Sequence, residues 1–219
     1  MSEFGVYVHI PFCRHRCDYC AFATWTDRDH LMVAYVDAVI ADIARAVEKG
    51  MPVADTVFFG GGTPTRLDPE LLASIVSAIP VTSNAEITVE CNPDDVTVEM
   101  MKIYAAAGVN RISMGVQSMV DHVLQSLGRT HDPANVVRAI SAARAGGITS
   151  INLDLIYGVH GESVDDWRTT VEQTIALLPT HISAYGLTVE AGTPLAEDPS
   201  RHPDDDDQAD KYVLADDLF

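Results

Sequence analysis

Three cysteines in one short loop are the residues of this chain best suited to chemistry. Cys13, Cys17 and Cys20 are separated by three and two residues. Thiolates at such spacings commonly bind zinc or an iron–sulfur cluster. A [4Fe–4S] cluster normally takes four cysteines, and Ala21 stands where a fourth would follow. A cluster held by these three thiolates would leave one iron open to a small molecule.

The element that must position this loop is an apolar run from Phe4 to Ile10, which the residue types predict to be a strand. Pro11 ends the strand, because proline has no N–H for a ladder. The thiols therefore follow the carboxyl end of the first strand. Two alternatives to a cluster are open here: a zinc site completed by His9 or His15, and unpaired structural thiols.

Beyond the cysteine loop, apolar strands alternate with amphipathic helices along the whole chain. Such alternation predicts an α/β fold with a parallel sheet and right-handed crossovers. The expected strands after the first are 55–59, 85–91, 110–116, 150–157 and 181–187, and the expected helices are 29–49, 68–79, 97–107, 120–127, 133–145, 163–178 and 208–219. The acidic stretch 197–207 is expected to be a solvated loop.

Composition restricts the classes of function. The 219 residues, 47% of them apolar, suit one domain of α/β size with an ample core. With 32 acidic and 14 basic residues the formal charge is −18, which makes nucleic acid an unfavourable partner. The sequence contains no apolar run long enough to span a membrane and no basic, apolar signal segment at its start. We therefore expect a cytoplasmic protein.

Polar residues follow or interrupt several of the expected strands. Glu90, Gln117 and Asp154 each lie within or at the end of an apolar strand pattern. A buried carboxylate is costly unless it is paired or hydrogen-bonded, so three such residues at one rim indicate a polar site. The run Gly60 to Pro64 follows the second strand, and its glycines allow the backbone to approach a ligand closely. Cys91 is expected to be a buried thiol and not a fourth ligand.

The cysteine spacing resembles the signature of the radical S-adenosylmethionine (SAM) superfamily. Longer motifs resemble the oxygen-independent coproporphyrinogen III oxidase-like family, and they run in order along most of the chain: Tyr7-Val-His-Ile-Pro-Phe-Cys13, Gly60-Gly-Gly-Thr-Pro-Thr65, Ser113-Met-Gly-Val-Gln-Ser118 and Asn152-Leu-Asp-Leu-Ile-Tyr-Gly158. The resemblance implies a partial (β/α)6 TIM-like barrel. It also implies that a reduced [4Fe–4S] cluster cleaves SAM to methionine and a 5′-deoxyadenosyl radical.

The same resemblance assigns residues by position. It implies that the cluster ligands are Cys13, Cys17 and Cys20, and that Arg129 pairs with the SAM carboxylate, for which a guanidinium fork is suited. The remaining residues implied to contact the cofactor are Tyr7, Tyr19, Gly61, Gly62, Thr63, Glu90, Gln117, Asp154 and Thr188. No catalytic residue beyond these is assigned.

One position bears on the branch of the family. The oxidases carry a further cysteine two residues after the third, whereas this chain has Phe22, as heme chaperones typically do. We therefore favour a chaperone that binds heme and passes it to an apoprotein over an oxidase that decarboxylates coproporphyrinogen III. Either would need an electron donor, and a zinc-binding module that does neither is the third possibility.

Val159-His160 departs from the Leu-Pro that is usual in relatives. The resemblance therefore predicts no conformation for the loop after the fifth strand, but the departure does not affect the family assignment.

The resemblance also bears on domain organisation. Relatives continue with a further domain, whereas the last helix expected here runs to Phe219. We therefore expect residues 1–219 to form a radical SAM core domain that lacks a carboxyl-terminal part of the family.

Overall fold

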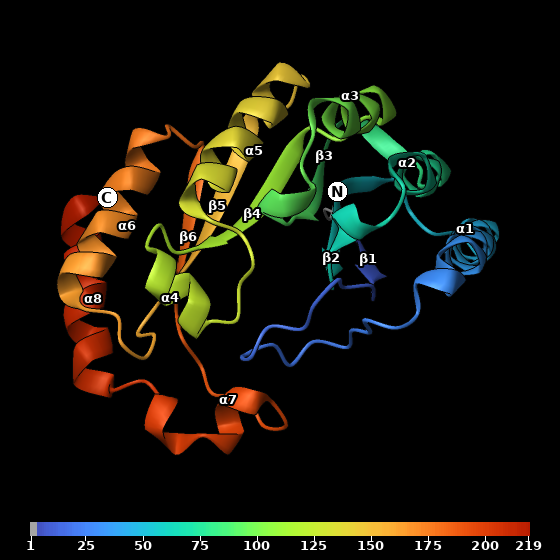
Figure 1. The fold of residues 1–219 in the computed structure, drawn as a ribbon. Helices are drawn as coiled ribbons and strands as arrows, with labels where there is room; N and C mark the ends of the chain where they lie inside the picture. Colours follow the sequence, from blue (N-terminus) through green and yellow to red (C-terminus); the bar gives the residue numbers. More distant parts are fainter. Residues whose placement is uncertain (1–3) are drawn as a thin grey trace.

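The computed structural model describes residues 4–219 and has at its centre a sheet of six parallel strands in the order β1-β2-β3-β4-β5-β6. Helices cover the outer face of this curved sheet (Figure 1). The strands are β1 Gly5–Ile10, β2 Ala54–Gly61, β3 Val81–Cys91, β4 Arg111–Gln117, β5 Ser150–Tyr157 and β6 His181–Gly186. The α-helices are α1 Met32–Glu48, α2 Pro69–Ala78, α3 Val98–Ala107, α4 Asp121–Ser126, α5 Pro133–Ala145, α6 Val164–Ala176, α7 Pro194–Glu197 and α8 Asp205–Leu218.

The two faces of the sheet differ in chemistry because side chains alternate along each strand. Phe59, Val89, Met114 and Leu153 point to the outer face and are fully buried in the core beneath the helices. Their neighbours one residue away point to the inner face, where polar groups such as Asp154 lie. The expected (β/α)6 partial barrel is therefore confirmed.

Side chains at the helix starts explain why the helices begin where they do. Asp68 accepts a hydrogen bond from Glu70 N at the start of α2, and Pro69 occupies the first turn, where its missing N–H costs nothing. Ser163 and Asp166 form a reciprocal capping box on α6. Gly108 ends α3 at φ +104°, a conformation that favours glycine.

The expected loop 197–207 is wrong at its carboxyl end. Helix α8 begins at Asp205, with Asp204 as the cap that accepts from Asp207 N. Carboxylates in the first turn interact favourably with the positive end of the helix dipole, so this acidic run starts a helix. Strand β3 also begins four residues before its expected start.

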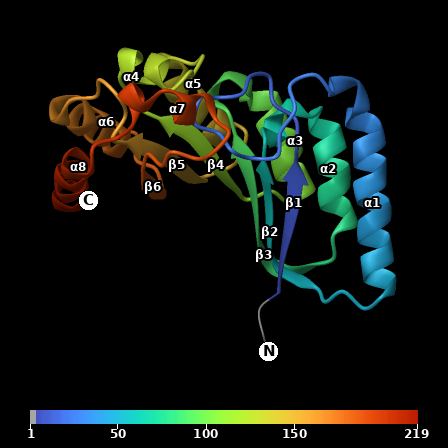
Figure 2. The ribbon, with the colours of Figure 1, turned by 90° about the horizontal axis from the view of Figure 1, so that it is seen from below.

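The carboxyl ends of the strands gather at the end of the molecule opposite Gly5, where β1 begins. Figure 2 shows the loop after β1, in blue, and α7, in red, both at this end. Parallel α/β sheets place their ligand sites at this end of the strands. Among residues 4–219, the structure shows no helix that is both long and apolar enough to cross a membrane.

Candidate cofactor site

A cavity of about 720 Å³ opens at the carboxyl ends of the strands. Its walls come from loops that lie far apart in the sequence. The residues predicted to form the site that line this cavity are Cys13, Cys17, Tyr19, Cys20, Gly61, Gly62, Thr63, Glu90, Gln117, Arg129, Asp154 and Thr188. The fold thus brings all but one of the predicted residues to a single concave surface.

The exception is Tyr7, which does not line the cavity. Its side chain is 58% exposed on the inner face of β1, where it stacks on Phe58 and hydrogen-bonds His9 Nδ1 at 3.0 Å. Its hydroxyl is close enough to Glu90 for that carboxylate to contribute to a raised pKa, although burial is the larger cause. The predicted contact of Tyr7 with the cofactor therefore stays a prediction.

Backbone hydrogen bonds hold the cysteine loop against the strand end. Cys13 N donates to Trp25 O at 3.0 Å, and Trp25 N donates to Pro11 O at 2.8 Å. These bonds fold the loop back on itself, and all three of its cysteines line the same cavity. Burial raises the pKa of Cys13, partly offset by hydrogen bonds from Thr63 and Thr24.

The glycine-rich loop is fixed to the same strand end. Gly62 N donates to Ile10 O at 2.7 Å, and Thr63 N donates to Phe12 O at 2.8 Å. A Cβ on Gly62 would lie 2.7 Å from Phe12 O and 3.1 Å from Cys13 Sγ, so no larger residue fits. Gly61 has φ +110°, which also requires glycine. The loop therefore presents bare backbone beside the cysteines.

Arg129 joins the cysteine loop to the end of β4. Its Nη1 donates to Cys17 Sγ at 3.3 Å and its Nη2 to Gly115 O at 3.0 Å. Its Nε is buried and has no partner within residues 4–219. A buried donor without a partner is unusual in a native protein and indicates a missing acceptor. A carboxylate in the cavity would supply one.

Glu90 is a buried carboxylate at the end of β3. Burial raises its pKa to about 7, against the opposing effect of Gly61 N, which donates to its Oε2 at 3.1 Å. The charge of Asp154 across the cavity raises the pKa further. Glu90 therefore changes its protonation state near neutral pH.

We expect Glu90→Gln to raise the melting temperature at pH 8 by roughly 2–4 °C, the shift that about 1 kcal/mol produces in a domain of this size, and to change it little at pH 5. The pKa of Glu90 in the folded protein lies above the ordinary 4.5. The folded protein therefore binds more protons than the unfolded chain between pH 4.5 and about 7. It therefore loses stability as the pH rises through about 7. Thermal denaturation across this range, with the exposed Glu99→Gln as control, measures the effect. An equal change at both pH values would contradict the assignment.

Asp154 is held by a hydrogen-bond network on the inner face of the sheet that the sequence did not reveal. Ser113 Oγ donates to Asp154 Oδ2 at 2.7 Å, and Asn152 Nδ2 donates to Asp154 Oδ1 at 2.9 Å. His181 Nδ1 lies 2.5 Å from Asn152 Oδ1. Ser113 and Asn152 are also polar residues inside apolar strands. The rule that identified Glu90 would have found them too.

Gln117 is strained, in keeping with its place in a site. Its φ of +66° is one of two positive values among non-glycine residues in the described chain, and it coincides with a register shift between β4 and β5. Strained backbone of this kind clusters at functional sites, where the surroundings hold it in place. The irregularity turns the end of β4 toward the cavity that Gln117 lines.

The fourth thiol, Cys91, differs from the three thiols of the loop. Cys91 is buried, its Sγ donates to Val89 O at 3.5 Å, and burial strongly raises its pKa. These are the properties expected of a structural thiol, although the residue borders the cavity.

Thr188, at the other side of the cavity, is exposed, and its hydroxyl donates to Gly186 O at 3.4 Å.

The donor set fits a thiolate-bound cluster better than a zinc ion. Both ring nitrogens of His9 are engaged, Nδ1 with Tyr7 and Nε2 with Ala23 O at 2.9 Å, so this side chain offers no free ligand atom. Within residues 4–219, no three His, Cys, Asp or Glu side chains converge on one point that would suit a single ion. A four-iron cluster is larger and accepts more widely spaced thiolates.

Comparison with known proteins identifies the family. The model of the radical SAM superfamily matches residues 7–174. The chain belongs to the radical SAM superfamily. The matched region contains the cysteine loop, the glycine-rich loop and all predicted site residues except Thr188, so the resemblance drawn from the motifs is confirmed. Proteins of this superfamily use a [4Fe–4S] cluster and SAM, which are the groups that the donor set of the cavity fits.

Individual relatives place this radical SAM domain more narrowly. It is 40% identical to the heme chaperone HemW of Mycobacterium tuberculosis, over 98% of this chain and 58% of that protein, and 38% identical to HemW of Escherichia coli, over 94% and 56%. Among solved structures, coproporphyrinogen III oxidase (HemN) from Escherichia coli matches with a TM-score of 0.86 at 27% identity, over 96% of this chain and 51% of that one. The chain thus spans about half the length of the relatives it matches.

Proposed function

We propose that this chain is the cluster- and SAM-binding domain of a heme chaperone, a protein that binds heme and transfers it to apoproteins. The observation that carries the proposal is identity of 33–40% to several HemW proteins over most of the chain. The cavity supports it as well. Phe22 lines the cavity at the position where the oxidases have a further cysteine.

The residues on the cavity wall have distinct tasks in this proposal. Cys13, Cys17 and Cys20 hold the cluster, which when reduced supplies the electron that cleaves SAM. The bare backbone of Gly61 and Gly62 accepts the close approach of the SAM amino group. Glu90, Gln117 and Asp154 bind its polar groups, including the ribose hydroxyls. Tyr19 and Thr188 contact SAM from two other parts of the cavity wall. The enclosing walls exclude water and keep the cofactor in one orientation.

Arg129→Ala is expected to weaken SAM binding by about ten- to a hundred-fold, because a charge-assisted hydrogen bond contributes roughly 1.5–3 kcal/mol. Calorimetric titration of the anaerobically reconstituted chain with SAM measures the change. The exposed Arg138→Ala on α5 serves as the matched control. Equal affinity for Arg129→Ala and wild type would remove Arg129 from the SAM site.

The heme function is tested with the whole parent protein, since the heme-binding part need not lie within residues 1–219. We expect stoichiometric heme binding and transfer to an apoprotein, without turnover of coproporphyrinogen III. Absorbance titration with hemin, and transfer to an apo-hemoprotein followed by its heme spectrum, measure both steps. Absence of heme binding by the whole protein would refute the chaperone function.

A coproporphyrinogen III oxidase is the second candidate, favoured by the close structural match to HemN. The two candidates differ in outcome when the parent protein, with its cluster reduced, meets SAM and coproporphyrinogen III without oxygen. Multiple turnovers to protoporphyrinogen, detected by chromatography, would establish the oxidase. In either case the protein requires an electron donor. Since thiols that bind a cluster must stay reduced, we propose that the protein works in the cytoplasm.

A further inference from the structure

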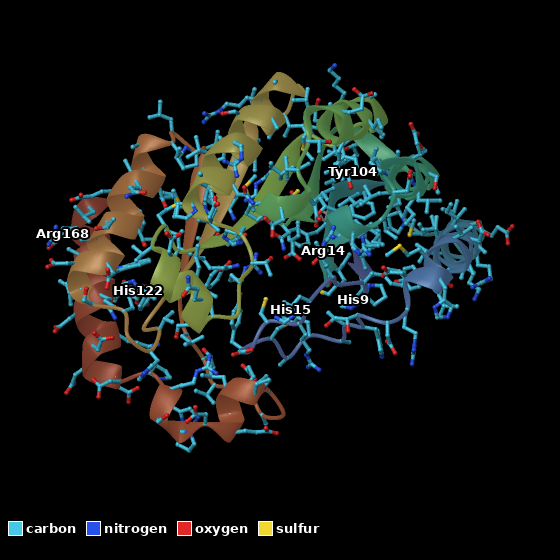
Figure 3. All side chains as sticks on the ribbon, in the orientation of Figure 1. His9, Arg14, His15, Tyr104, His122 and Arg168 are labelled. Carbon is cyan, nitrogen blue, oxygen red and sulfur yellow. The ribbon has the colours of Figure 1, made fainter. Side chains whose placement is uncertain are left out.

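The cysteine loop carries a local excess of positive charge on a strongly acidic protein. Arg14, His15 and Arg16 stand between the first two cysteines, and no acidic residue lies from 4 to 17. All three are exposed and border the cavity, and Figure 3 labels Arg14 and His15 on this loop. The chain as a whole has a formal charge of −18. A positive surface on such a background attracts an acidic partner to one place.

The ion pairs within and beside this loop leave part of its positive charge exposed. Arg14 Nη2 lies 3.3 Å from Asp95 Oδ1, yet the Arg14 side chain stays 65% exposed while that of Asp95 is nearly buried. Arg16 uses its Nε–H for Cys20 O and has no carboxylate partner among residues 4–219. Asp18, in the same loop, is already paired with Arg201 at 2.9 Å. Donor groups of both loop arginines therefore remain available to an incoming surface.

Two exposed aromatic side chains follow in the same loop. Phe22 is 61% exposed and Trp25 is 48% exposed, and both belong to the segment that follows the third cysteine. Exposed aromatic side chains beside arginines are the composition typical of protein–protein contact surfaces. The segment is joined to the first cysteine, because Cys13 N donates to Trp25 O at 3.0 Å, and Phe22 borders the same cavity as the three thiols.

We propose that Arg14, Arg16, Phe22 and Trp25 form the docking surface for an acidic protein that carries single electrons. The inference rests on the proposed function, since it takes the three cysteines to hold a redox cluster. In the transfer the carrier is oxidised by one electron and the cluster is reduced by one, and no covalent bond forms or breaks. Charge complementarity brings the carrier to the loop, and the apolar pair provides the contact across which the electron passes.

The first test measures binding without the cluster. An oxidised acidic flavodoxin is titrated into the metal-free chain, with binding followed by interferometry at low and high salt. Arg14→Glu with Arg16→Glu is expected to weaken binding about ten-fold, and added salt to weaken binding of the wild type. The matched control reverses two exposed arginines elsewhere, Arg45→Glu on α1 and Arg138→Glu on α5. Equal weakening by the control pair would overturn the proposal, as would unchanged binding in the Arg14 and Arg16 variant.

The second test uses the reconstituted chain and two reductants. The reversed loop should slow the loss of cluster absorbance with reduced flavodoxin but not with reduced methyl viologen, a small cation. The variant Arg14→Lys with Arg16→Lys, which keeps the charge, should retain most of the wild-type rate. If lysine fails as badly as glutamate, or if hemin and not the flavodoxin responds to the reversal, the docking assignment is wrong. Iron and sulfide assays on the same samples report separately whether the cysteines hold the cluster.

Discussion

Replacing any one of Cys13, Cys17 and Cys20 by alanine is expected to remove the iron–sulfur cluster from the reconstituted chain. In the proposed site these three thiols are the only protein ligands of a cluster that normally takes four. They line one cavity, and the one other cysteine there, Cys91, is buried. Iron should fall from about four per chain to near zero, and the visible charge-transfer absorbance of the cluster should be lost with it. Anaerobic reconstitution followed by iron and sulfide assays measures it.

Cys91→Ala is the matched control for this prediction. Cys91 is a thiol that borders the same cavity, but it is buried and its pKa is strongly raised by that burial. It is therefore a poor ligand, and its replacement should leave the iron content unchanged. Four irons bound in any one of the three loop variants, or loss of the cluster in Cys91→Ala, would contradict the ligand assignment. Circular dichroism of each apo variant shows whether the fold persists.

The sequence predicted much of this site because its chemistry is concentrated in short loops after strands. The cysteine spacing, the glycines at 60–62 and the carboxylates at the ends of apolar runs are all local patterns. The alternation of strands and helices predicted a parallel sheet, and the family resemblance implied the barrel; the observed sheet brings the loops together. What local patterns do not contain is the pairing of side chains from distant elements. The bond from Arg129 to Cys17 joins residues 112 positions apart, and no spacing rule indicates it.

The acidic start of α8 shows a different limit. Asp204 to Asp207 look like a solvated loop because four adjacent carboxylates repel one another. In the structure one caps the helix and another, Asp207, pairs with Lys211 one turn later. The spacing of four residues between these two was visible in the sequence and is typical of a helical ion pair. The burial of Lys211 was not, since a lysine in a polar helix is normally exposed.

Lys211 is the centre of a buried charge cluster that attaches α8 to the rest of the domain. Its Nζ donates to Glu162 O at 2.8 Å and Asp207 Oδ2 at 2.6 Å and lies 3.2 Å from Glu162 Oε2, so all its donors are used. The side chains of Lys211 and Glu162 are both fully buried. Glu162 Oε2 also accepts from Gly158 N at 2.8 Å, which fixes the loop after β5. From the same helix Gln208 donates to Leu187 O at 2.9 Å, at the cavity rim.

Lys211→Met is expected to lower the free energy of unfolding by about 3–5 kcal/mol, because it leaves Glu162 as an unpaired buried charge. Burial already raises the pKa of Glu162 against the opposing effect of Lys211, so the loss of Lys211 should raise it further. The deficit should accordingly be smaller at pH 5 than at pH 8, because the folded variant can neutralise Glu162 by proton uptake at a lower free-energy cost at the lower pH. Denaturant titration at both values measures it, with the exposed Lys102→Met on α3 as control. The double variant Lys211→Met with Glu162→Gln should recover part of the loss. A deficit below about 1 kcal/mol, within the range of an exposed ion pair, would show that the cluster does not hold α8 in place.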